Sequence, residues 1–410
     1  MSRMSRYFGC LAVLMLVLSA ANVRAQSSDR ASSRMSDDSP DWSTQFVAQP
    51  AAEPPAEPNP PQPRPAPRPT RTSARDSYVR LARAPNMFGD TLRPVGSVSL
   101  KPDGQIADRE PLDYNLMLGG GASYNAAHNN RAAPTDRAYF LYNGFYNAVN
   151  YTQPGAIPPY GSADLHLYTA GVEKTFLDGT WSLDLRMPFT NGFNLVTNDF
   201  ATDSGRIGNL SAFLKHLAYE DDAMALSGGL GFGLPTGSDV VSGNGFGTLT
   251  LQNEAIHFMP FVAMTASPND NWFIQAFAQI DFAATGNEVI ANNVGVGKYT
   301  EQNLLHLDAT LGRWLAQDLD RYYLNGIAAI VELHYTSTLN NSDEVFVSSL
   351  GGFGYLGNPL NRLDLLNLTS GLHFQISELS NLRVGAVVPL RAQPERVFDS
   401  EIQVSFNRMF

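Results

Sequence analysis

Apolar and polar side chains alternate along much of the chain after residue 112, in segments of about ten to fourteen residues. The clearest segment is Trp181–Met187, in which Ser182, Asp184 and Arg186 alternate with apolar or aromatic residues. Residues 271–283 behave in the same way. Because successive side chains of a strand point to opposite faces, this period of two predicts β-strands with one apolar and one polar face.

The connections between these segments alternate between short and long. Short joints occur at Asp178–Gly179, Glu220–Asp222 and Pro268–Asp270. Transmembrane barrels have short periplasmic turns and long outer loops, whereas the loops of a soluble β-sandwich need not alternate in length. With a first strand near 113–124 and residues 139–151 in the first outer loop, the pattern predicts an all-β, antiparallel up-and-down transmembrane barrel of about twelve strands. The long links are 125–162, 191–206, 237–254, 284–302, 339–361 and 391–399.

The N-terminus has the order of a secretory signal. Two arginines precede the apolar run Leu11–Leu18, and small residues follow up to Ala25. We expect residues 1–25 to be a signal peptide that is cleaved near Ala25–Gln26, because the run is shorter than the roughly 20 apolar residues of a membrane helix; an uncleaved anchor is the alternative. The single cysteine, Cys10, lies in this segment, so the mature chain has no thiolate ligand and no cysteine nucleophile.

Residues 26–110 are predicted to be a disordered periplasmic linker rich in proline and arginine, followed by a barrel over 111–410. Ten prolines fall within 50–69, a composition that favours extended polyproline II. The linker is either a solvated spacer or a tether to the cell wall or a periplasmic partner. The formal net charge is −11, which argues against nucleic acid as a partner, since nucleic-acid binding requires a basic surface.

The C-terminus and the middle of the chain resemble known barrels. A terminal phenylalanine after alternating apolar positions resembles the insertion signal that the assembly machinery of the outer membrane recognises, although Arg408 departs from that pattern. The matching residues are Ile402, Val404, Phe406 and Phe410. Met187–Pro188, Gly208–Leu210 and Leu234–Gly237 resemble recurring motifs of the "MetA-pathway of phenol degradation" family of outer-membrane proteins. This resemblance implies a barrel in the cell outer membrane and an uptake channel for apolar or aromatic compounds.

Alternation assigns a set of polar side chains to the barrel interior. Charge on the lipid face costs about 2–4 kcal/mol for Arg or Lys at mid-membrane, so these groups are expected to point inward. Opposite charges there either brace a narrow barrel or form a constriction that selects permeants, and one residue can do both. The predicted lumen-lining residues are Asp164, His166, Asp184, Arg186, Lys215, Gln275, Asp281, His306, Asp308, Glu332, His334, Asn367, His373 and Arg383.

Two further readings of these residues stay open at this point. Carboxylate and imidazole groups two apart, beginning at Asp164, His306 and Glu332, could bind a metal or move a proton, but alternation alone produces that spacing. The aromatic residues between Tyr139 and Tyr151 form either an interfacial girdle or a plug.

The sequence therefore predicts an outer-membrane channel for passive uptake of small molecules, apolar or aromatic ones included, and no enzyme. We expect no catalytic residue, no cofactor and no bound metal. A structural anchor whose proline-rich arm contacts the cell wall is the first alternative. An outer-membrane lipid hydrolase is the second; it would need an activated serine, and Ser227 lies in no Gly-x-Ser-x-Gly motif.

Overall fold

The computed structural model describes most of the chain from residue 84 to the C-terminus. The predicted signal peptide and residues 26–83 of the predicted linker lie outside the described residues. No helix in the described part is long and apolar enough to cross a membrane. The described residues are 84–90, 92, 97–102, 112–115, 118–122, 124–152, 160–190, 195–196, 201–203, 206–317, 324–358, 361–393 and 395–410.

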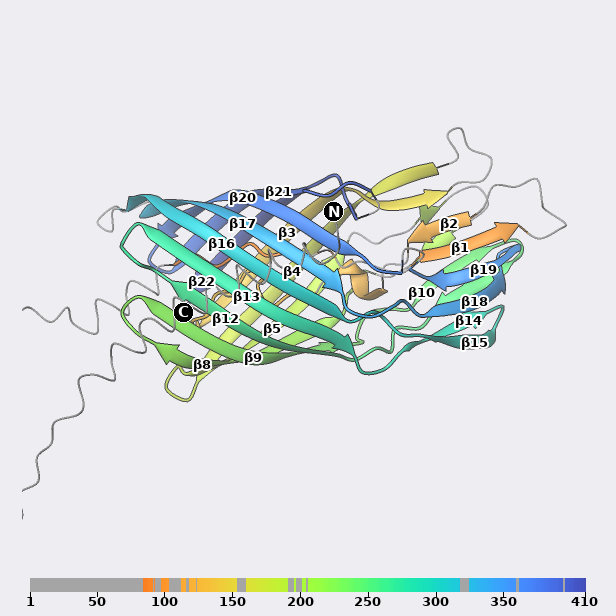
Figure 1. Cartoon of the computed structure of the whole chain (residues 1–410), viewed down its shortest axis with the longest axis horizontal. Coiled ribbons are helices and arrows are strands. Elements are labelled where there is room, and N and C mark those ends of the chain that lie inside the picture. The colour runs from red at the N-terminus through yellow and green to blue at the C-terminus, as the bar shows by residue number, and fades with distance from the viewer. Residues whose placement is uncertain are drawn as a thin grey trace, which may run out of the picture. The chain divides into compact units, whose positions relative to one another are not determined.

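Twelve antiparallel strands form a closed barrel, as the sequence predicted (Figure 1). Neighbouring strands in the barrel are consecutive along the chain, and pairing of the first with the last, Tyr142 opposite Val404 among others, closes the ring. Closure leaves no unpaired edge, so every strand satisfies its backbone groups on both sides. The strands are β3 (Arg137–Thr152), β4 (Tyr160–Phe176), β5 (Trp181–Thr190), β8 (Leu210–Glu220), β9 (Met224–Leu234), β12 (His257–Ala266), β13 (Trp272–Ala283), β16 (Leu304–Gln317), β17 (Gly326–Thr338), β20 (Asp364–Ser377), β21 (Ser380–Pro389) and β22 (Ser400–Met409).

The first strand of the barrel differs from the prediction. The strand expected near 113–124 does not belong to the barrel, and the segment 139–151, expected in an outer loop, lies within β3. The reason is visible in the parity of β3, whose aromatic residues fall on both faces: Tyr139 and Phe145 are buried, whereas Phe140 and Tyr146 are exposed. A strand with aromatic residues on both faces lacks the clean apolar–polar alternation by which the other strands were recognised.

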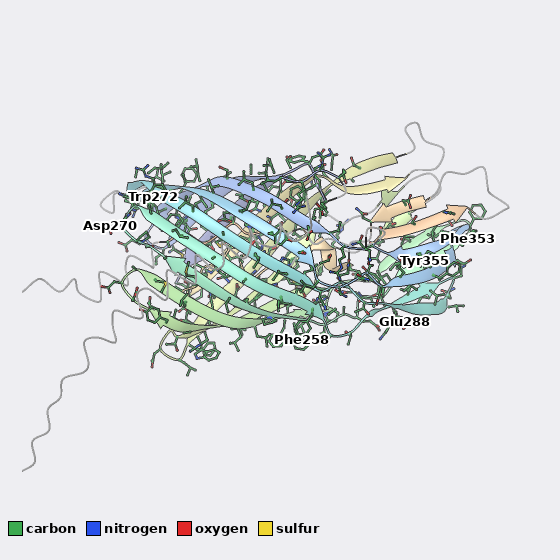
Figure 2. All side chains as sticks on the ribbon, viewed as in Figure 1. Phe258, Asp270, Trp272, Glu288, Phe353 and Tyr355 are labelled. Carbon is green, nitrogen blue, oxygen red and sulfur yellow. The ribbon has the colours of Figure 1, made fainter. Side chains whose placement is uncertain are left out.

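The outer surface of the barrel is an apolar band between two groups of aromatic rings. Phe258 of β12 stacks on Phe282 at a centroid distance of 5.7 Å and meets the Phe232 ring edge to face at 5.6 Å. Trp272 lies at the opposite end of the barrel (Figure 2). The ten residue steps from Trp272 to Phe282 along a tilted strand span about 25 Å, which is the height of the lipid-facing band of a membrane barrel.

Four of the predicted long links, 191–206, 237–254, 284–302 and 339–361, contain strands. With two strands that precede the barrel, they build a second β-structure, here called the cap, beyond one end of the barrel (Figure 1). One group extends the barrel sheet through β3: β1 (Ser97–Pro102), β2 (Leu112–Asn115), β18 (Glu344–Ser349) and β19 (Gly352–Gly357). The other group is a six-stranded sheet: β6 (Leu195–Val196), β7 (Ala201–Asp203), β10 (Val240–Asn244), β11 (Gly247–Leu251), β14 (Asn287–Ala291) and β15 (Val294–Tyr299).

The cap has an apolar core. Val98, Val289 and Val347 are completely buried in it, and Leu165 and Phe145, at the adjacent end of the barrel, belong to the same apolar cluster. The short 3-10 helix η1 (Leu118–Gly121) contributes Leu118 to its edge. The interior of the molecule therefore changes from polar in the barrel to apolar in the cap.

Candidate functional site in the barrel interior

The interior of the barrel is occupied by two segments of the chain itself, residues 84–90 and 124–132. They run antiparallel and bond to each other: the Met87 amide donates to the Asn130 carbonyl at 2.8 Å, and the Asn129 amide donates to the Phe88 carbonyl at 3.2 Å. We call these two segments, residues 84–90 and 124–132, the lumenal hairpin; along the chain between them lie β1 and β2 of the cap.

The hairpin runs the length of the barrel. Ala84 lies at the end where the turns between strands are short, because its carbonyl accepts from Arg131, which also donates to Thr135 just before β3. At the other end, the Asp90 carboxylate accepts from Asn367 near the start of β20. Thus one leg rises from the short-turn end to the cap and the other returns, so that β3 begins at the short-turn end.

This placement corrects the predicted boundary between linker and barrel. The sequence analysis put residues up to 110 in a disordered linker, but residues 84–90 are packed inside the barrel and 97–102 form β1. The backbone of 84–90 makes no ladder with the barrel wall. Its polar groups are paired by side chains that lie far away in the sequence, so no local pattern marks the segment as ordered.

Side chains of the wall pair with the hairpin backbone. The Glu332 carboxylate accepts from the Phe88 amide at 2.9 Å and from the Gly89 amide at 3.0 Å. The Gln279 amide both donates to the Tyr124 carbonyl and accepts from the Ala126 amide, each at 2.7 Å. Buried backbone groups left without partners would cost roughly 1–3 kcal/mol each, so these wall side chains make the polar backbone compatible with burial.

Cationic wall residues bind the carbonyls and amides of the hairpin. Arg186 donates to the Asn125 carbonyl at 2.8 Å, and Lys215 donates to the Asn130 side chain at 2.8 Å and to the Arg131 carbonyl at 2.9 Å. Arg383 donates to the Met87 carbonyl at 2.5 Å and to the carbonyl of the preceding residue. The predicted lumen charges therefore serve as ligands of a segment of the same chain.

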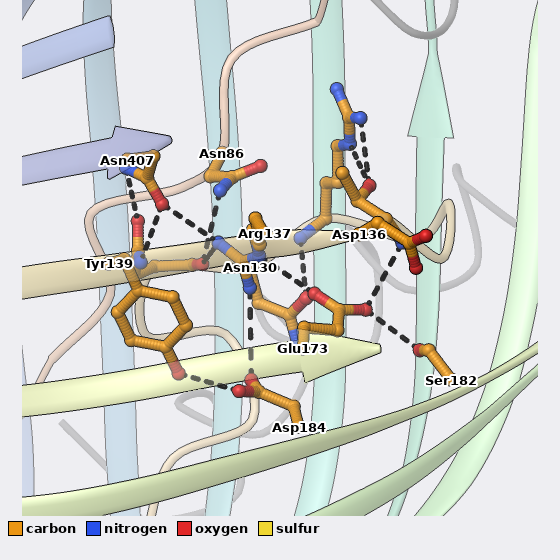
Figure 3. Close-up of polar contacts among 12 residues, drawn as sticks. Asn86, Asn130, Asp136, Arg137, Tyr139, Glu173, Ser182, Asp184 and Asn407 are labelled. Carbon is orange, nitrogen blue, oxygen red and sulfur yellow. Dashed lines mark hydrogen bonds and ion pairs between the residues drawn. The ribbon is translucent and has the colours of Figure 1, made fainter. Parts of the chain in front are cut away.

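Two of these cations, Arg186 and Lys215, are neutralised together with Arg137 by wall carboxylates near the short-turn end (Figure 3). Glu173 accepts from Arg137 at 2.8 Å and lies 3.0 Å from the Lys215 ammonium group. Asp184 lies 2.9 Å from Arg186 and 3.7 Å from Arg137. All five side chains are almost fully buried, and a buried charge is tolerated only when it is paired and hydrogen-bonded.

Two glycines and one aromatic ring fix the position of the ascending leg. The Phe88 ring packs against Gly371 and Gly385, where an added Cβ would come within 2.5 and 2.9 Å of it. Gly89 has a φ of +77°, and a Cβ there would lie 2.4 Å from the His128 Cα on the other leg. Gly89 is thus required by both the backbone conformation and the close approach of the two legs.

Most of the predicted lumen residues do face inward. Asp164 and His166 do not: Asp164 is exposed, His166 is half-buried, and the His166 ring stacks on Tyr142 outside the wall at 6.0 Å. At this level of β4 the interior is the apolar core shared with the cap, so Leu165 and Leu167 point inward and the polar positions point outward. The twelve predicted residues that are buried on the inner face are Asp184, Arg186, Lys215, Gln275, Asp281, His306, Asp308, Glu332, His334, Asn367, His373 and Arg383.

The carboxylate–imidazole pairs act within the hydrogen-bond network. His334 Nδ1 lies 2.6 Å from Asp308, and its Nε2 lies 3.0 Å from the Thr369 hydroxyl. No group of three or more potential ligands that could hold a metal ion occurs among the described residues. Ser227, the serine considered for a hydrolase, donates to the Ala132 carbonyl at 2.5 Å and so anchors the descending leg.

Sequence reasoning missed several residues of the site. Arg137 and Tyr139 were missed because their strand was assigned to a loop. Glu173 was missed because Asp164, near the other end of β4, was taken to mark the inward face, and Glu173 lies on the opposite face of that strand. Gln403 donates to the Gly89 carbonyl at 3.0 Å. It lies on the polar face of the last strand, a face that the alternation did reveal, but nothing local indicated its partner.

The residues of the predicted insertion signal lie on the lipid-facing side of β22. Ile402, Phe406 and Phe410 are exposed, and Val404 between them is half-buried. Arg408 shares this face and donates to the Ser380 hydroxyl at 2.7 Å on the neighbouring strand. The geometry is that of an apolar strand face; its role in assembly stays a prediction.

Comparisons with known proteins gave structural neighbours only. No protein-family model matches the chain, and no curated protein matches its sequence. Among solved structures, it is similar to the COG4313 outer membrane channel from Pseudomonas putida F1, at 12% identity and a TM-score of 0.43, over 68% of this chain and 96% of that one.

A second neighbour is the NanC porin, with 8% identity and a TM-score of 0.38, over 66% of this chain and 98% of that one. A third is a mutant of the TodX monoaromatic hydrocarbon channel, with 11% identity and a TM-score of 0.37, over 68% of this chain and 91% of that one. These neighbours are outer-membrane β-barrel channels. At such scores the likeness carries no argument about function, and membership of the MetA-pathway family is not confirmed.

Proposed function

We propose that this chain is a gated channel of a bacterial outer membrane, in which the lumenal hairpin is the gate. The observation that carries the proposal is the chemistry of the contact between hairpin and wall. Glu332, Gln279 and Arg186 hold the hairpin by hydrogen bonds, and these groups are polar enough to be solvated by water when the hairpin leaves. A polar wall is stable both when filled by the hairpin and when filled by water.

The permeant is proposed to be a small molecule, with apolar or aromatic compounds as the first candidates. The described feature that favours this class is the apolar interior of the cap, which includes Leu100 and Val347 and lies above the polar lumen. The resemblance to the MetA-pathway family suggests the same class. Liposome swelling with mandelate, compared with lactate as a non-aromatic counterpart, tests it; equal rates for the two solutes would contradict an aromatic preference.

A disulfide between hairpin and wall tests the gate. The Asp90 carboxylate accepts from the Asn367 amide at 2.8 Å, so Asp90→Cys with Asn367→Cys places one thiol on the hairpin and one on the wall strand that it contacts, in a background in which Cys10 is also replaced. In a planar bilayer, the oxidised protein is expected to stay closed and the reduced protein to show openings. The Asp90→Cys single variant controls for loss of the carboxylate. Equal conductance of the oxidised and reduced double variant would contradict gating by the hairpin.

A structural anchor is the second candidate, and the filled lumen is the observation that favours it. In that case the barrel only holds the proline-rich arm of residues 26–83, which would contact the cell wall or a periplasmic partner. If the reduced double variant never conducts, and deletion of 26–83 weakens the envelope without changing permeability, the anchor replaces the channel. If deletion changes neither, the arm is a spacer.

Export and assembly are proposed to follow the sequence signals. Residues 1–25 direct export, and the face that ends at Phe410 is recognised by the assembly machinery of the outer membrane. Phe410→Ser is expected to reduce the amount of assembled, heat-modifiable barrel several-fold, because it removes the last apolar side chain of that face. Met409→Ser, on the same strand end, is the matched control. Normal assembly of the Phe410 variant would contradict recognition of this residue.

A further inference from the structure

The cap carries a hollow on its outer side that no part of the channel mechanism uses. Three strands, β1, β19 and β18, form its floor, and its volume is about 440 Å³. This size falls in the range of about 300–1,000 Å³ that is typical of pockets for small ligands. It is lined by Ser99, Lys101, Glu344, Phe353 and Tyr355, among others.

The hollow does not open to the barrel interior. On β1, Ser99 and Lys101 face the solvent, whereas Val98 and Leu100 between them are buried in the cap core. The same alternation holds on β18, where Glu344 is exposed and Val345 is buried. An occupant of the hollow is therefore separated from the barrel interior by the apolar core.

Exposed aromatic rings dominate the floor. Tyr355 is 54% exposed and Phe346 52%, and the two lie opposite each other on paired strands with ring centroids 5.6 Å apart. Phe353, two residues before Tyr355, is 46% exposed. Figure 2 shows Phe353 and Tyr355 on the cap. Exposed clusters of large rings are unusual on a water-facing surface and mark binding sites.

Polar groups stand at opposite corners of this floor. Lys101 pairs with Phe353 on the neighbouring strand, and Glu344 pairs with Gly357, four residues further along β19. The two charged residues are therefore about 13 Å apart along the strand direction. Neither forms an ion pair with another described side chain. Between the two corners, Ser99 lies next to Tyr355, and Gly357 next to Glu344 carries no side chain that would fill the space.

The geometry points to a binding site for a short saccharide chain. Rings in a row offer flat apolar surfaces for the C–H faces of successive sugar units, and the hydroxyl, ammonium and carboxylate groups at the edges can pair with sugar hydroxyls. The distance between the corners suits an oligomer better than one sugar unit. A protein partner is disfavoured, because standard interfaces use about 20–30 residues a side. A lipid chain would use the rings but make no contact that requires the Lys101 ammonium or the Glu344 carboxylate.

Binding of the purified full-length protein to an array of neutral, acidic and amino oligosaccharides tests this site. We expect at least one saccharide class to bind, and Phe353→Ala with Tyr355→Ala to weaken that binding about tenfold or more. Phe246→Ala removes an exposed ring from the β10–β11 turn of the same cap and is the matched control, expected to bind as the wild type does.

The measurement can overturn the proposal in three ways. The array can show no binding above that of the double variant, the double variant can bind as well as the wild type, or toluene can displace a bound saccharide and itself bind more tightly to the same residues. Heat-modifiability of every variant establishes that the barrel is folded. Because the hollow is separated from the lumen, loss of saccharide binding with unchanged conductance would leave the proposed channel function untouched.

Discussion

The barrel and the cap are built from the same kind of alternating antiparallel strand, but their faces are reversed. In the barrel, Leu183 and Ile274 point outward and Asp184 and Gln275 point inward. In the cap, Val98 and Leu100 point inward, while Ser99 between them is exposed. The alternation shows that each strand has one apolar and one polar face. The medium outside each region, lipid or water, determines which of the two faces points outward.

The reversal takes place within single strands. On β4, Leu165 and Leu167 face the apolar core near the cap, and Glu173, on the same side of the strand, faces the charged lumen. A strand that crosses the boundary therefore keeps its parity while its inner face changes from apolar to charged. Three predictions separate the two regions and a fourth concerns the short-turn end of the barrel, from the largest expected effect to the smallest.

Truncation of the apolar cap core should have the largest effect. Leu100→Ala removes a side chain that is 1% exposed, and such cavities typically cost about 2–5 kcal/mol. We expect the cap to lose protection from proteolysis and hydrogen exchange while the barrel stays folded. Thr369→Ala, at a fully buried position of the barrel wall, should cost only about 1 kcal/mol. Loss of protection in both regions together would mean that they unfold as one unit.

A charge on the outer surface should distinguish lipid from water. Val331 lies near the middle of β17 and is 47% exposed, and Val331→Arg is expected to destabilise the barrel by about 2–4 kcal/mol in lipid vesicles. Val241 of the cap is 43% exposed, and Val241→Arg should change stability by less than about 0.5 kcal/mol. Urea titrations in vesicles measure both. A similar cost at the two positions would place them in the same medium and contradict the membrane boundary.

The fold was largely predictable from the sequence because the lipid-facing strands carry a local signal. Trp181–Met187 shows its two faces in seven consecutive letters, and no tertiary contact is needed to see them. β3 escaped because Tyr139 and Phe140 present rings to both faces. The hairpin escaped because its order comes from side chains such as Glu332, which lies 244 residues from Phe88.

The residues of the candidate site could be predicted from the sequence, but the groups that they bind could not. The position of Arg383 or Lys215 on a polar strand face follows from alternation alone. That these groups bind the Met87 and Arg131 carbonyls depends on which segments enter the barrel, and a period of two carries no such information. The inverted faces of Asp164 and His166 show the same limit, since alternation does not reveal where the medium changes.

A charge inside the barrel should matter more than the same charge on the cap. Glu332→Gln keeps the shape of the side chain but weakens its bonds to the Phe88 and Gly89 amides, at a cost of about 1–2 kcal/mol to the seated hairpin. Single-channel recordings should show more frequent openings. Glu344→Gln on the exposed side of the cap is the control and should leave the openings unchanged. Identical recordings from the two variants would show that Glu332 does not hold the gate.

The smallest effect is expected from an exposed contact at the short-turn end. Asp136 accepts hydrogen bonds from the Lys174 ammonium group and from the Thr175 amide and hydroxyl, each at 2.6 Å. Partial burial alone would raise its pKa, but the hydrogen bonds and the Lys174 charge outweigh it and lower the pKa below the ordinary value. A folded-state pKa below the unfolded one means that this contribution is complete above about pH 4 and is lost as the pH falls through the folded-state pKa.

The Asp136→Asn variant should therefore be less stable than the wild type by less than about 1 kcal/mol at neutral pH, as is usual for an exposed ion pair. The difference should begin to shrink below about pH 4, where the carboxylate of the unfolded chain is protonated, and should disappear as the pH falls through the lower pKa of the folded state. Thermal unfolding between pH 3 and 7 measures it, with Asp222→Asn in the neighbouring turn as the control. If the stability difference were the same at pH 3 as at pH 7, the effect of Asp136 would come from hydrogen-bond geometry alone, and its charge would not stabilise the short-turn end.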